Sequence, residues 1–225
     1  MERKVYAIFV AGGSGTRMGG DTPKQFLPLG DKSVLQHTIE VFLEAEPDLN
    51  VIVVLPKAHF QTWKEMCLVN CFDHKHSLVA GGITRFHSVK NALKKVPDGA
   101  IVSIHDGVRP FISPQLIRDM IKKMSTSRAL IPVVPVVDTL KSLEEGVEHP
   151  DRTKIAAVQT PQMFYSEDIK AAYEQAYDLS FTDDSSVAEK ASLKVDTIPG
   201  EKLNIKITTK EDLELGRAIL LLRNS

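Results

Sequence analysis

The chain has 225 residues, 43% of them hydrophobic, and it carries 28 Lys+Arg against 29 Asp+Glu, a formal net charge of -1. A chain of this length buries enough surface to fold without a disulfide or a metal staple, so we expect one domain over residues 1–225. The balanced charge argues against a nucleic-acid partner, because phosphate backbones are bound by clustered basic surfaces.

The first segment has a charged start and a short apolar run, residues 5–11, which superficially resembles a secretion signal. A glycine-rich segment follows this run in place of a cleavage site. No apolar stretch of the sequence reaches the roughly 20 residues that span a bilayer. We therefore expect a cytoplasmic protein with no membrane partner. Its two cysteines, Cys67 and Cys71, fall in a predicted helix, and we expect buried or half-buried thiols there rather than metal ligands.

Short apolar runs alternate along the chain with segments of helical periodicity. The runs lack polar alternation, as do parallel strands covered on both faces; they are Tyr6–Val10, Val51–Leu55, Ala100–Ile104 and Leu130–Val137. Caps predict helices over Val34–Ala45 (Ser33 with Gln36), from Ser113-Pro114 to about Lys123, over Asp183–Ala191 (after Thr182) and from Thr209 with Asp212 through Leu222. This order predicts an α/β fold with a mainly parallel twisted sheet, helices on both faces and right-handed crossovers.

Residues 138–158 interrupt this alternation. Hydrophobic and polar residues alternate with period 2 around Gly146, which predicts two strands that project as a β-arm. An isolated strand pair is only marginally stable in water. The β-arm is therefore expected to pack on something else, and a partner subunit is the economical candidate.

A glycine-rich loop, residues 11–25, follows the first predicted strand directly. Ligands of open parallel sheets bind at this edge, and glycines allow backbone amides to approach a phosphate closely. The dinucleotide fingerprint fails because Met18 stands where its third glycine belongs, and the P-loop fails at Asp21 and Thr22. The loop carries two cations instead, Arg17 and Lys24. A glycine turn with exposed basic residues is the alternative interpretation.

Seven further blocks extend the pattern over nearly the whole chain: Gly81-Gly82-Ile83-Thr84-Arg85 with Ser88, His105-Asp106-Gly107-Val108-Arg109-Pro110, Pro135-Val136-Val137-Asp138-Thr139-Leu140-Lys141, Asp151-Arg152, Gln159-Thr160-Pro161-Gln162, Thr182-Asp183-Asp184 and Asn204-Ile205-Lys206-Ile207-Thr208. Together with Gly-Gly-Ser-Gly-Thr-Arg-Met and Pro-Lys-Gln-Phe in the loop, these blocks resemble the 2-C-methyl-D-erythritol 4-phosphate cytidylyltransferases of the non-mevalonate isoprenoid pathway. The resemblance implies a Rossmann-like nucleotidyltransferase fold.

The reaction that the resemblance implies is attack of a sugar-alcohol phosphate on the α-phosphorus of CTP, with release of pyrophosphate. The sequence has no evident catalytic triad, H-E-x-x-H motif or carboxylate pair, and this chemistry needs none. A phosphate monoester has its second pKa near about 6, so the attacking oxygen is already ionised at neutral pH. The protein's task would be to position two anions and stabilise charge at the α-phosphoryl group.

The resemblance also implies roles at the nucleotide. Arg17 and Lys24 would stabilise charge around the triphosphate, and Mg²⁺ or another divalent cation would bridge the phosphates. Asp106 could help to hold that ion, which the phosphates mainly hold, or could cap the following turn. Ile83 stands where the family often has an acidic residue, so cytosine selectivity depends on whether this side chain reads the base. The implied nucleotide-binding residues are Ala11, Gly12, Gly13, Ser14, Gly15, Gly82, Ser88 and Asp106.

At the acceptor phosphate the resemblance implies Arg152 and Lys206, and the planar fork of arginine suits a phosphate. From the residues alone, Arg152 could form a surface ion pair with Asp151, and Lys206 could be a strand residue that faces solvent. The remaining acceptor-binding candidates are Arg109, which could instead pair with Asp106, and Asp138, Thr139, Thr160 and Thr182. In the family the β-arm crosses to the partner of a homodimer, so Arg152 would complete the neighbour's site.

Two other functions are considered. The ribitol or ribulose 5-phosphate cytidylyltransferases of cell-wall polymer synthesis share the glycine loop and the Gln-Thr-Pro-Gln block, whereas Val-Val-Asp-Thr-Leu-Lys and Asp-Arg-Thr favour the methylerythritol family. A nucleotide-sensing protein with the same fold and no turnover is the second. The presence of all four cations, Arg17, Lys24, Arg152 and Lys206, argues against it.

Overall fold

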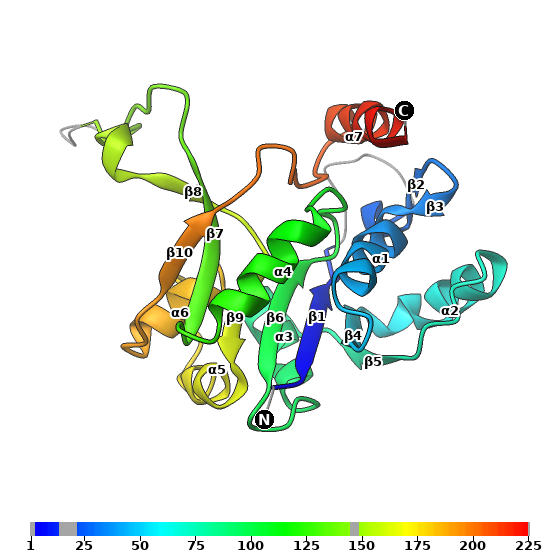
Figure 1. Cartoon of the computed structure of the whole chain (residues 1–225), viewed down its shortest axis with the longest axis horizontal. Coiled ribbons are helices and arrows are strands. Elements are labelled where there is room, and N and C mark those ends of the chain that lie inside the picture. Colours follow the sequence, from blue (N-terminus) through cyan, green and yellow to red (C-terminus); the bar gives the residue numbers. More distant parts are fainter. Residues whose placement is uncertain (1–2, 14–21, 145–148, 225) are drawn as a thin grey trace.

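The structure is a computed structural model that describes residues 3–13, 22–144 and 149–224, and a single large sheet forms its centre (Figure 1). Its strands are β1 (Val5–Val10), β4 (Asn50–Leu55), β5 (His76–Ala80), β6 (Ile101–Asp106), β7 (Ala129–Pro135), β8 (Ala156–Val158), β9 (Gln162–Tyr165) and β10 (Asp196–Pro199). They are arranged in the order β10-β7-β9-β6-β1-β4-β5, and β8 pairs with the end of β7. A short hairpin of β2 (Pro28–Leu29) and β3 (Lys32–Ser33) lies apart from this sheet.

Four of the seven strand pairs in the large sheet are parallel, and β8 is antiparallel to β7. β1 runs parallel to both of its neighbours, β4 and β6, while β5 and β10 run parallel to β4 and β7. β9 is antiparallel to both β6 and β7. The prediction of an α/β fold with a mainly parallel sheet is confirmed, with β9 as an inserted antiparallel strand.

Helices cover both faces of the sheet: α1 (Val34–Ala45), α2 (Phe60–Val69), α3 (Arg85–Leu93), α4 (Pro114–Lys123), α5 (Ser166–Ala172) and α6 (Asp184–Lys190). The α7 helix (Lys210–Asn224) packs in a separate cluster with Leu29 of β2. There are 3-10 turns at Lys24–Phe26, Lys57–His59 and Arg152–Lys154. The α1 helix begins where predicted, because Ser33 Oγ accepts the Gln36 N–H. The predicted helix over Asp183–Ala191, capped by Thr182, begins one residue later, at Asp184. Asp183 caps this helix and forms a capping box with Ser186, because a carboxylate can accept the free amides of the first turn.

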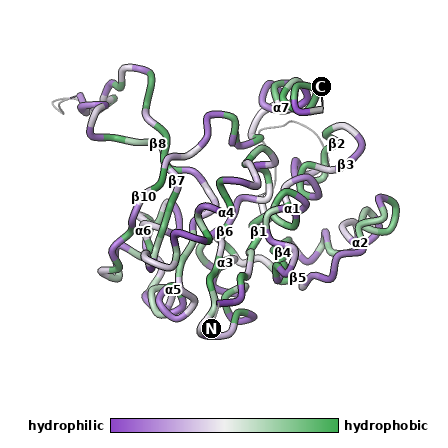
Figure 2. Tube along the Cα trace, in the orientation of Figure 1, coloured by the Kyte–Doolittle hydropathy of each residue, from purple (hydrophilic) through white to green (hydrophobic). Residues whose placement is uncertain are grey.

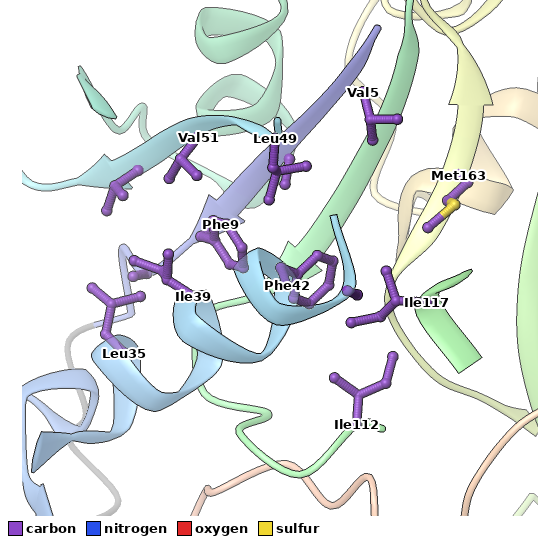
Figure 3. Close-up of a cluster of buried hydrophobic side chains, with 14 of the residues drawn as sticks. Val5, Phe9, Leu35, Ile39, Phe42, Leu49, Val51, Ile112, Ile117 and Met163 are labelled. Atoms are coloured by element: carbon purple, nitrogen blue, oxygen red, sulfur yellow. The ribbon is translucent and has the colours of Figure 1, made fainter. Parts of the chain in front are cut away.

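The hydrophobic core lies in two layers, one on each side of the sheet. On one side, Phe9 of β1 points toward Ile39 and Phe42 of α1, and α2 and α4 complete this layer (Figure 3). Ile8 faces the other side, where α3, α5 and α6 pack. Figure 2 shows hydrophobic residues along the central strands and an alternation with hydrophilic residues along α4. Successive side chains of β1 point to opposite faces of the sheet, and helices cover both faces. This explains why the sequence of β1 is apolar throughout.

The β-arm differs from its prediction. Residues 138–144 and 149–158 project from the end of β7 (Figure 1), but among them only β8 is a strand. β8 pairs with β7 from Val133↔Val158 to Pro135↔Ala156, whereas residues 138–144 form no strand. The two-strand prediction is therefore wrong for the first limb. An extended segment needs a hydrogen-bonding neighbour, and within the described part of the arm only β8 has one, at the end of β7.

The structure also bears on the predicted burial of the two cysteines. Cys67 is half-buried in α2, but Cys71 follows the helix in an exposed position with φ of 51°, so the expectation that both thiols are buried or half-buried is wrong for Cys71. Burial raises the pKa of the Cys67 thiol to about 11. None of the helices in the described ranges has the length and apolarity needed to cross a bilayer.

Candidate active site

A cavity of about 290 Å³ opens at the carboxyl ends of β1 and β6. The strand order reverses at β1, which is the position where open α/β sheets bind ligands. Eight residues predicted for the site line this cavity: Ala11, Gly12, Gly13, Lys24, Gly82, Ser88, Asp106 and Lys206. Chain segments far apart in the sequence therefore meet at the predicted edge of the sheet.

The described part of the glycine-rich loop is anchored at its start. The Ala11 N–H donates to the Val54 carbonyl at 3.0 Å, and Gln25 Nε2 donates to the Ala11 carbonyl at 2.8 Å. A Cβ added to Gly12 would meet no described atom within 4 Å, so open space lies beside this backbone. Ser14, Gly15 and Arg17 fall outside the described residues, and their roles stay predictions.

The opposite wall is the turn that leads into α3. The Ser88 hydroxyl accepts the Gly82 N–H at 3.0 Å and donates to the Thr84 carbonyl at 2.9 Å. Gly82 is required here, because an added Cβ would lie 2.4 Å from His87 Cβ. The Ser88 side chain thus shapes the turn. Ile83 lines the cavity with 96% of its surface exposed, so a bound ligand can cover an apolar side chain there.

Asp106 ends β6 among three cations. Its carboxylate oxygens lie 2.9 Å from Lys206 Nζ, 3.5 Å from Arg109 Nε and 3.8 Å from Arg85 Nε. Burial would raise the pKa of the Asp106 carboxyl, but the charges of Arg85, Lys206 and Arg109 outweigh burial and hold the pKa well below its usual range. No backbone amide of the described residues bonds to this carboxylate. Its partners are cations, so the capping alternative does not describe it.

Arg85 links this cluster to a buried carboxylate that the sequence interpretation did not select. Its guanidinium donates to both oxygens of Asp184 at 2.7 and 2.6 Å, and the Tyr173 hydroxyl donates to the same carboxylate at 2.6 Å. Asp184 is fully buried. Both residues stood in recognised blocks, but the 99 residues between them left no sequence signal that they pair.

Arg109 and Thr160 lie beside Asp106 without lining the cavity. Arg109 makes two interactions. Its Nε pairs with Asp106, and its Nη1 donates at 2.8 Å to the carbonyl of Asn204, in the segment that carries Lys206. The Thr160 hydroxyl accepts the Asp106 N–H at 3.1 Å and contacts His105 Nδ1 at 3.0 Å. The predicted donation of this hydroxyl to the acceptor would require one of these bonds to open.

The remaining acceptor candidates are exposed and lie away from the cavity lining: Asp138, Thr139, Arg152 and Thr182. Arg152 Nη1 donates to the Val137 carbonyl at 2.8 Å within the β-arm. Asp151 bonds to Thr153 and lies 3.8 Å from Lys154, so the alternative Asp151–Arg152 ion pair is not formed. Lys206 is exposed, as its alternative interpretation expected, but it is not a strand residue: it follows β10 in an irregular segment and binds Asp106.

Comparison with known proteins places this geometry in a family. The family model of 2-C-methyl-D-erythritol 4-phosphate cytidylyltransferase (IspD) matches residues 5–222. The chain belongs to this family. It is 47% identical over 218 residues to the enzyme of that name from Bacteroides thetaiotaomicron, covering 96% of this chain and 100% of the relative. The relative of the same name from Clostridioides difficile is 40% identical over 219 residues, which are 95% of this chain and 92% of that one.

Solved structures of this family share the fold. The 4-diphosphocytidyl-2C-methyl-D-erythritol synthase from Anaerococcus prevotii is similar with a TM-score of 0.83 and 30% identity, covering 98% of this chain and 97% of that one. The cytidylyltransferase from Thermus thermophilus has a TM-score of 0.74 and 28% identity, covering 97% and 98%. The bifunctional IspDF from Campylobacter jejuni aligns with 94% of this chain over 53% of its own length, with a TM-score of 0.80 and 28% identity.

One carboxylate of this cavity could hold a divalent cation together with substrate phosphates. The described residues contain no group of three His, Cys, Asp or Glu that could hold a metal ion. Asp106 offers one carboxylate beside the glycine-rich loop. Mg²⁺ is commonly held by one or two carboxylates together with substrate phosphates and waters, so this single carboxylate fits an ion that arrives with a nucleotide.

Proposed function

We propose that this chain transfers the cytidylyl group of CTP to 2-C-methyl-D-erythritol 4-phosphate, giving 4-diphosphocytidyl-2-C-methyl-D-erythritol and pyrophosphate. Family membership over residues 5–222 supports this reaction and favours the methylerythritol acceptor over a pentitol phosphate. The observation that carries the proposal is the meeting of Lys24, Asp106 and Lys206 with Gly12 and Gly13 in one cavity. Such a site suits an anionic nucleotide at the ends of parallel strands.

The residues act by position and charge. An oxygen of the acceptor phosphate attacks the α-phosphorus, the bond from this phosphorus to the bridging oxygen breaks, and its electron pair leaves with pyrophosphate. Lys24 and Arg17 stabilise the charge that gathers on the triphosphate, and Lys206 and Arg152 hold the acceptor phosphate. The attacking oxygen is ionised at neutral pH, so no side chain has to remove a proton.

Asp106 is the residue that would hold a divalent cation, and we propose Mg²⁺ as that cation. The ion, when bound, neutralises phosphate charge and fixes the orientation of the triphosphate. Asp106 and Lys206 bind each other at 2.9 Å in the structure. An incoming acceptor phosphate offers Lys206 a second anionic partner, so the same lysine can bind the acceptor while Asp106 turns to the cation.

We also propose that the chain forms a homodimer through the β-arm. Asp138, Thr139 and Arg152 are exposed and do not line the cavity of their own chain, so they are available to the site of another copy. The β-arm exposes large apolar side chains, with 96% of Leu143 and 41% of Val158 accessible. Burying them against a second copy would remove this apolar area from water.

Residues 1–225 act in this proposal as one nucleotidyltransferase domain. We place the reaction in the cytoplasm, where CTP is formed and used. Neither nucleic acid nor a membrane takes part, and the two bound ligands are CTP and a sugar-alcohol phosphate.

The proposal is tested by product analysis. Purified protein is incubated with CTP, 2-C-methyl-D-erythritol 4-phosphate and MgCl₂, and the nucleotide products are identified by mass spectrometry. Pyrophosphate and 4-diphosphocytidyl-2-C-methyl-D-erythritol should form in equal amounts, and neither should form when the acceptor is left out. Pyrophosphate release without the acceptor, or no product with it, would contradict the proposal.

A further inference from the structure

His105 is a buried histidine beneath the cavity with a hydrogen-bond partner at each ring nitrogen. Nε2 lies 3.1 Å from the Arg109 carbonyl oxygen, and Nδ1 lies 3.0 Å from Thr160 Oγ1. The side chain has no exposed surface, and its ring packs against Phe9 and Phe42 with centroid separations of 6.2 and 4.8 Å. A ring enclosed in this way keeps one orientation.

The partners determine where the protons lie. A carbonyl oxygen can only accept, so His105 Nε2 carries a hydrogen and donates to Arg109. In a ring with its hydrogen on Nε2, Nδ1 is an acceptor, and the Thr160 hydroxyl donates to it at 3.0 Å. The same hydroxyl oxygen then accepts the Asp106 N–H at 3.1 Å. The donor and the acceptor of each hydrogen bond in this series are therefore defined.

We propose that His105, through the Thr160 hydroxyl, is a positioning residue that fixes Asp106 and the segment carrying Lys206. It binds the Arg109 carbonyl directly and the Asp106 amide through Thr160, and so holds both ends of the turn 106–109. The inference rests on the proposed function, because the positions of Asp106 and Lys206 matter only if both act on phosphates.

A second set of bonds extends this control to Lys206. The Thr160 carbonyl accepts Asn204 Nδ2 at 2.9 Å, and the Asn204 carbonyl accepts Arg109 Nη1 at 2.8 Å. Asn204 is fully buried and precedes Lys206 by two residues. The turn after β6 and the segment after β10 are thus joined through Thr160 and Arg109, and Lys206 meets Asp106 across the junction. Misplacing reacting groups by about 1 Å can cost roughly a hundredfold in rate.

The chain offers a matched set of variants. Thr160→Val removes the hydroxyl but keeps the shape, and Thr160→Ser keeps the hydroxyl. The control is Ser103→Ala, which removes a buried hydroxyl in β6. The oxygen of that hydroxyl bonds to no described atom. We expect Thr160→Val to lower kcat by about tenfold or more, with Thr160→Ser within about threefold of the wild type and Ser103→Ala unchanged. A Thr160→Val protein with unchanged kcat, or with only the acceptor KM raised, would overturn the inference.

A spectroscopic measurement keeps the test independent of turnover, and its first part uses the wild-type protein alone. In protein labelled with ¹⁵N-histidine, one imidazole should show a protonated Nε2 and an unprotonated Nδ1, and its Nδ1 signal should move in Thr160→Val. A proton on Nδ1 of this imidazole would overturn the inference. Failure of the proposed function is distinguishable, because wild-type protein would then form no product while the same imidazole signals persist.

Discussion

At the end of β6, two carboxylates lie among three cations. Asp106 and Asp184 carry two negative charges, whereas Arg85, Arg109 and Lys206 carry three positive ones. The excess positive charge is carried by side chains that are already fixed by their contacts. Preorganised charge of this kind stabilises an anionic transition state without reorganisation during the reaction.

The proposed role of fixed positive charge can be tested at Lys24. It lines the cavity and is almost fully buried. Replacing it with methionine keeps the chain length and removes the charge, so we expect kcat/KM with CTP to fall by about a hundredfold or more. The matched control is Lys122→Met, an exposed lysine of α4, which should leave kcat/KM within about twofold. Equal activity in both variants would remove Lys24 from the proposed mechanism.

Cys67 and Cys71 allow a prediction of pH dependence. The pKa of the Cys67 thiol is raised to about 11 by burial, so its reactive thiolate is scarce at pH 8. In a Cys71→Ser protein, alkylation of Cys67 by iodoacetamide should be slow at pH 8 and accelerate by about tenfold per pH unit up to pH 10. Mass spectrometry follows the adduct. A rate that levels off below pH 9 would contradict the buried environment of this thiol.

Among the helices, α6 contributes a buried carboxylate to the site. Asp184 binds Arg85 at the start of α3 in a bidentate pair and is fully buried, while the Lys90–Glu174 pair between α3 and the segment after α5 is 3.5 Å long with Glu174 78% exposed. Asp184→Asn should lower the free energy of unfolding by about 3 kcal/mol, because it leaves the Arg85 charge without its partner. Glu174→Gln should cost less than about 1 kcal/mol. Urea denaturation measures both, and similar losses would show that burial does not distinguish these pairs.

How much of the fold could be predicted differs between elements. The α1 and α4 helices begin where Ser33 and Ser113 cap them, because a cap is a local signal. The strand β9 was not predicted, because a run of only four residues is a weak strand signal. Its antiparallel direction is set by its neighbours in the sheet and not by its own sequence. The first limb of the β-arm has the alternation of a strand without forming one, because a strand also needs a neighbour.

The site shows the same division. Lys24, Asp106 and Lys206 were predictable because each stands in a recognised block and two of them follow strands. The bonds of Arg85 with Asp184 and of His105 with Thr160 join residues 99 and 55 positions apart. Contacts of this kind arise from packing of the whole sheet and leave no local pattern.

For the molecule as a whole, the proposed homodimer can be tested through the exposed β-arm. If Arg152 serves the partner's cavity, mixing Lys24→Met and Arg152→Ala proteins should restore activity, because one site of each mixed dimer is then intact. Random exchange predicts about a quarter of wild-type activity. Recovery that stays at the level of either variant alone, with subunit exchange verified by differently labelled chains, would rule out the shared site.

The acceptor substrate decides whether the chain acts as a methylerythritol phosphate cytidylyltransferase. The most direct measurement compares steady-state pyrophosphate release from CTP with 2-C-methyl-D-erythritol 4-phosphate and with ribitol 5-phosphate under identical conditions. We predict that kcat/KM is at least about tenfold higher for the methylerythritol acceptor, since this factor corresponds to only about 1.4 kcal/mol of transition-state binding. Equal values, or a preference for ribitol 5-phosphate, would contradict the assignment.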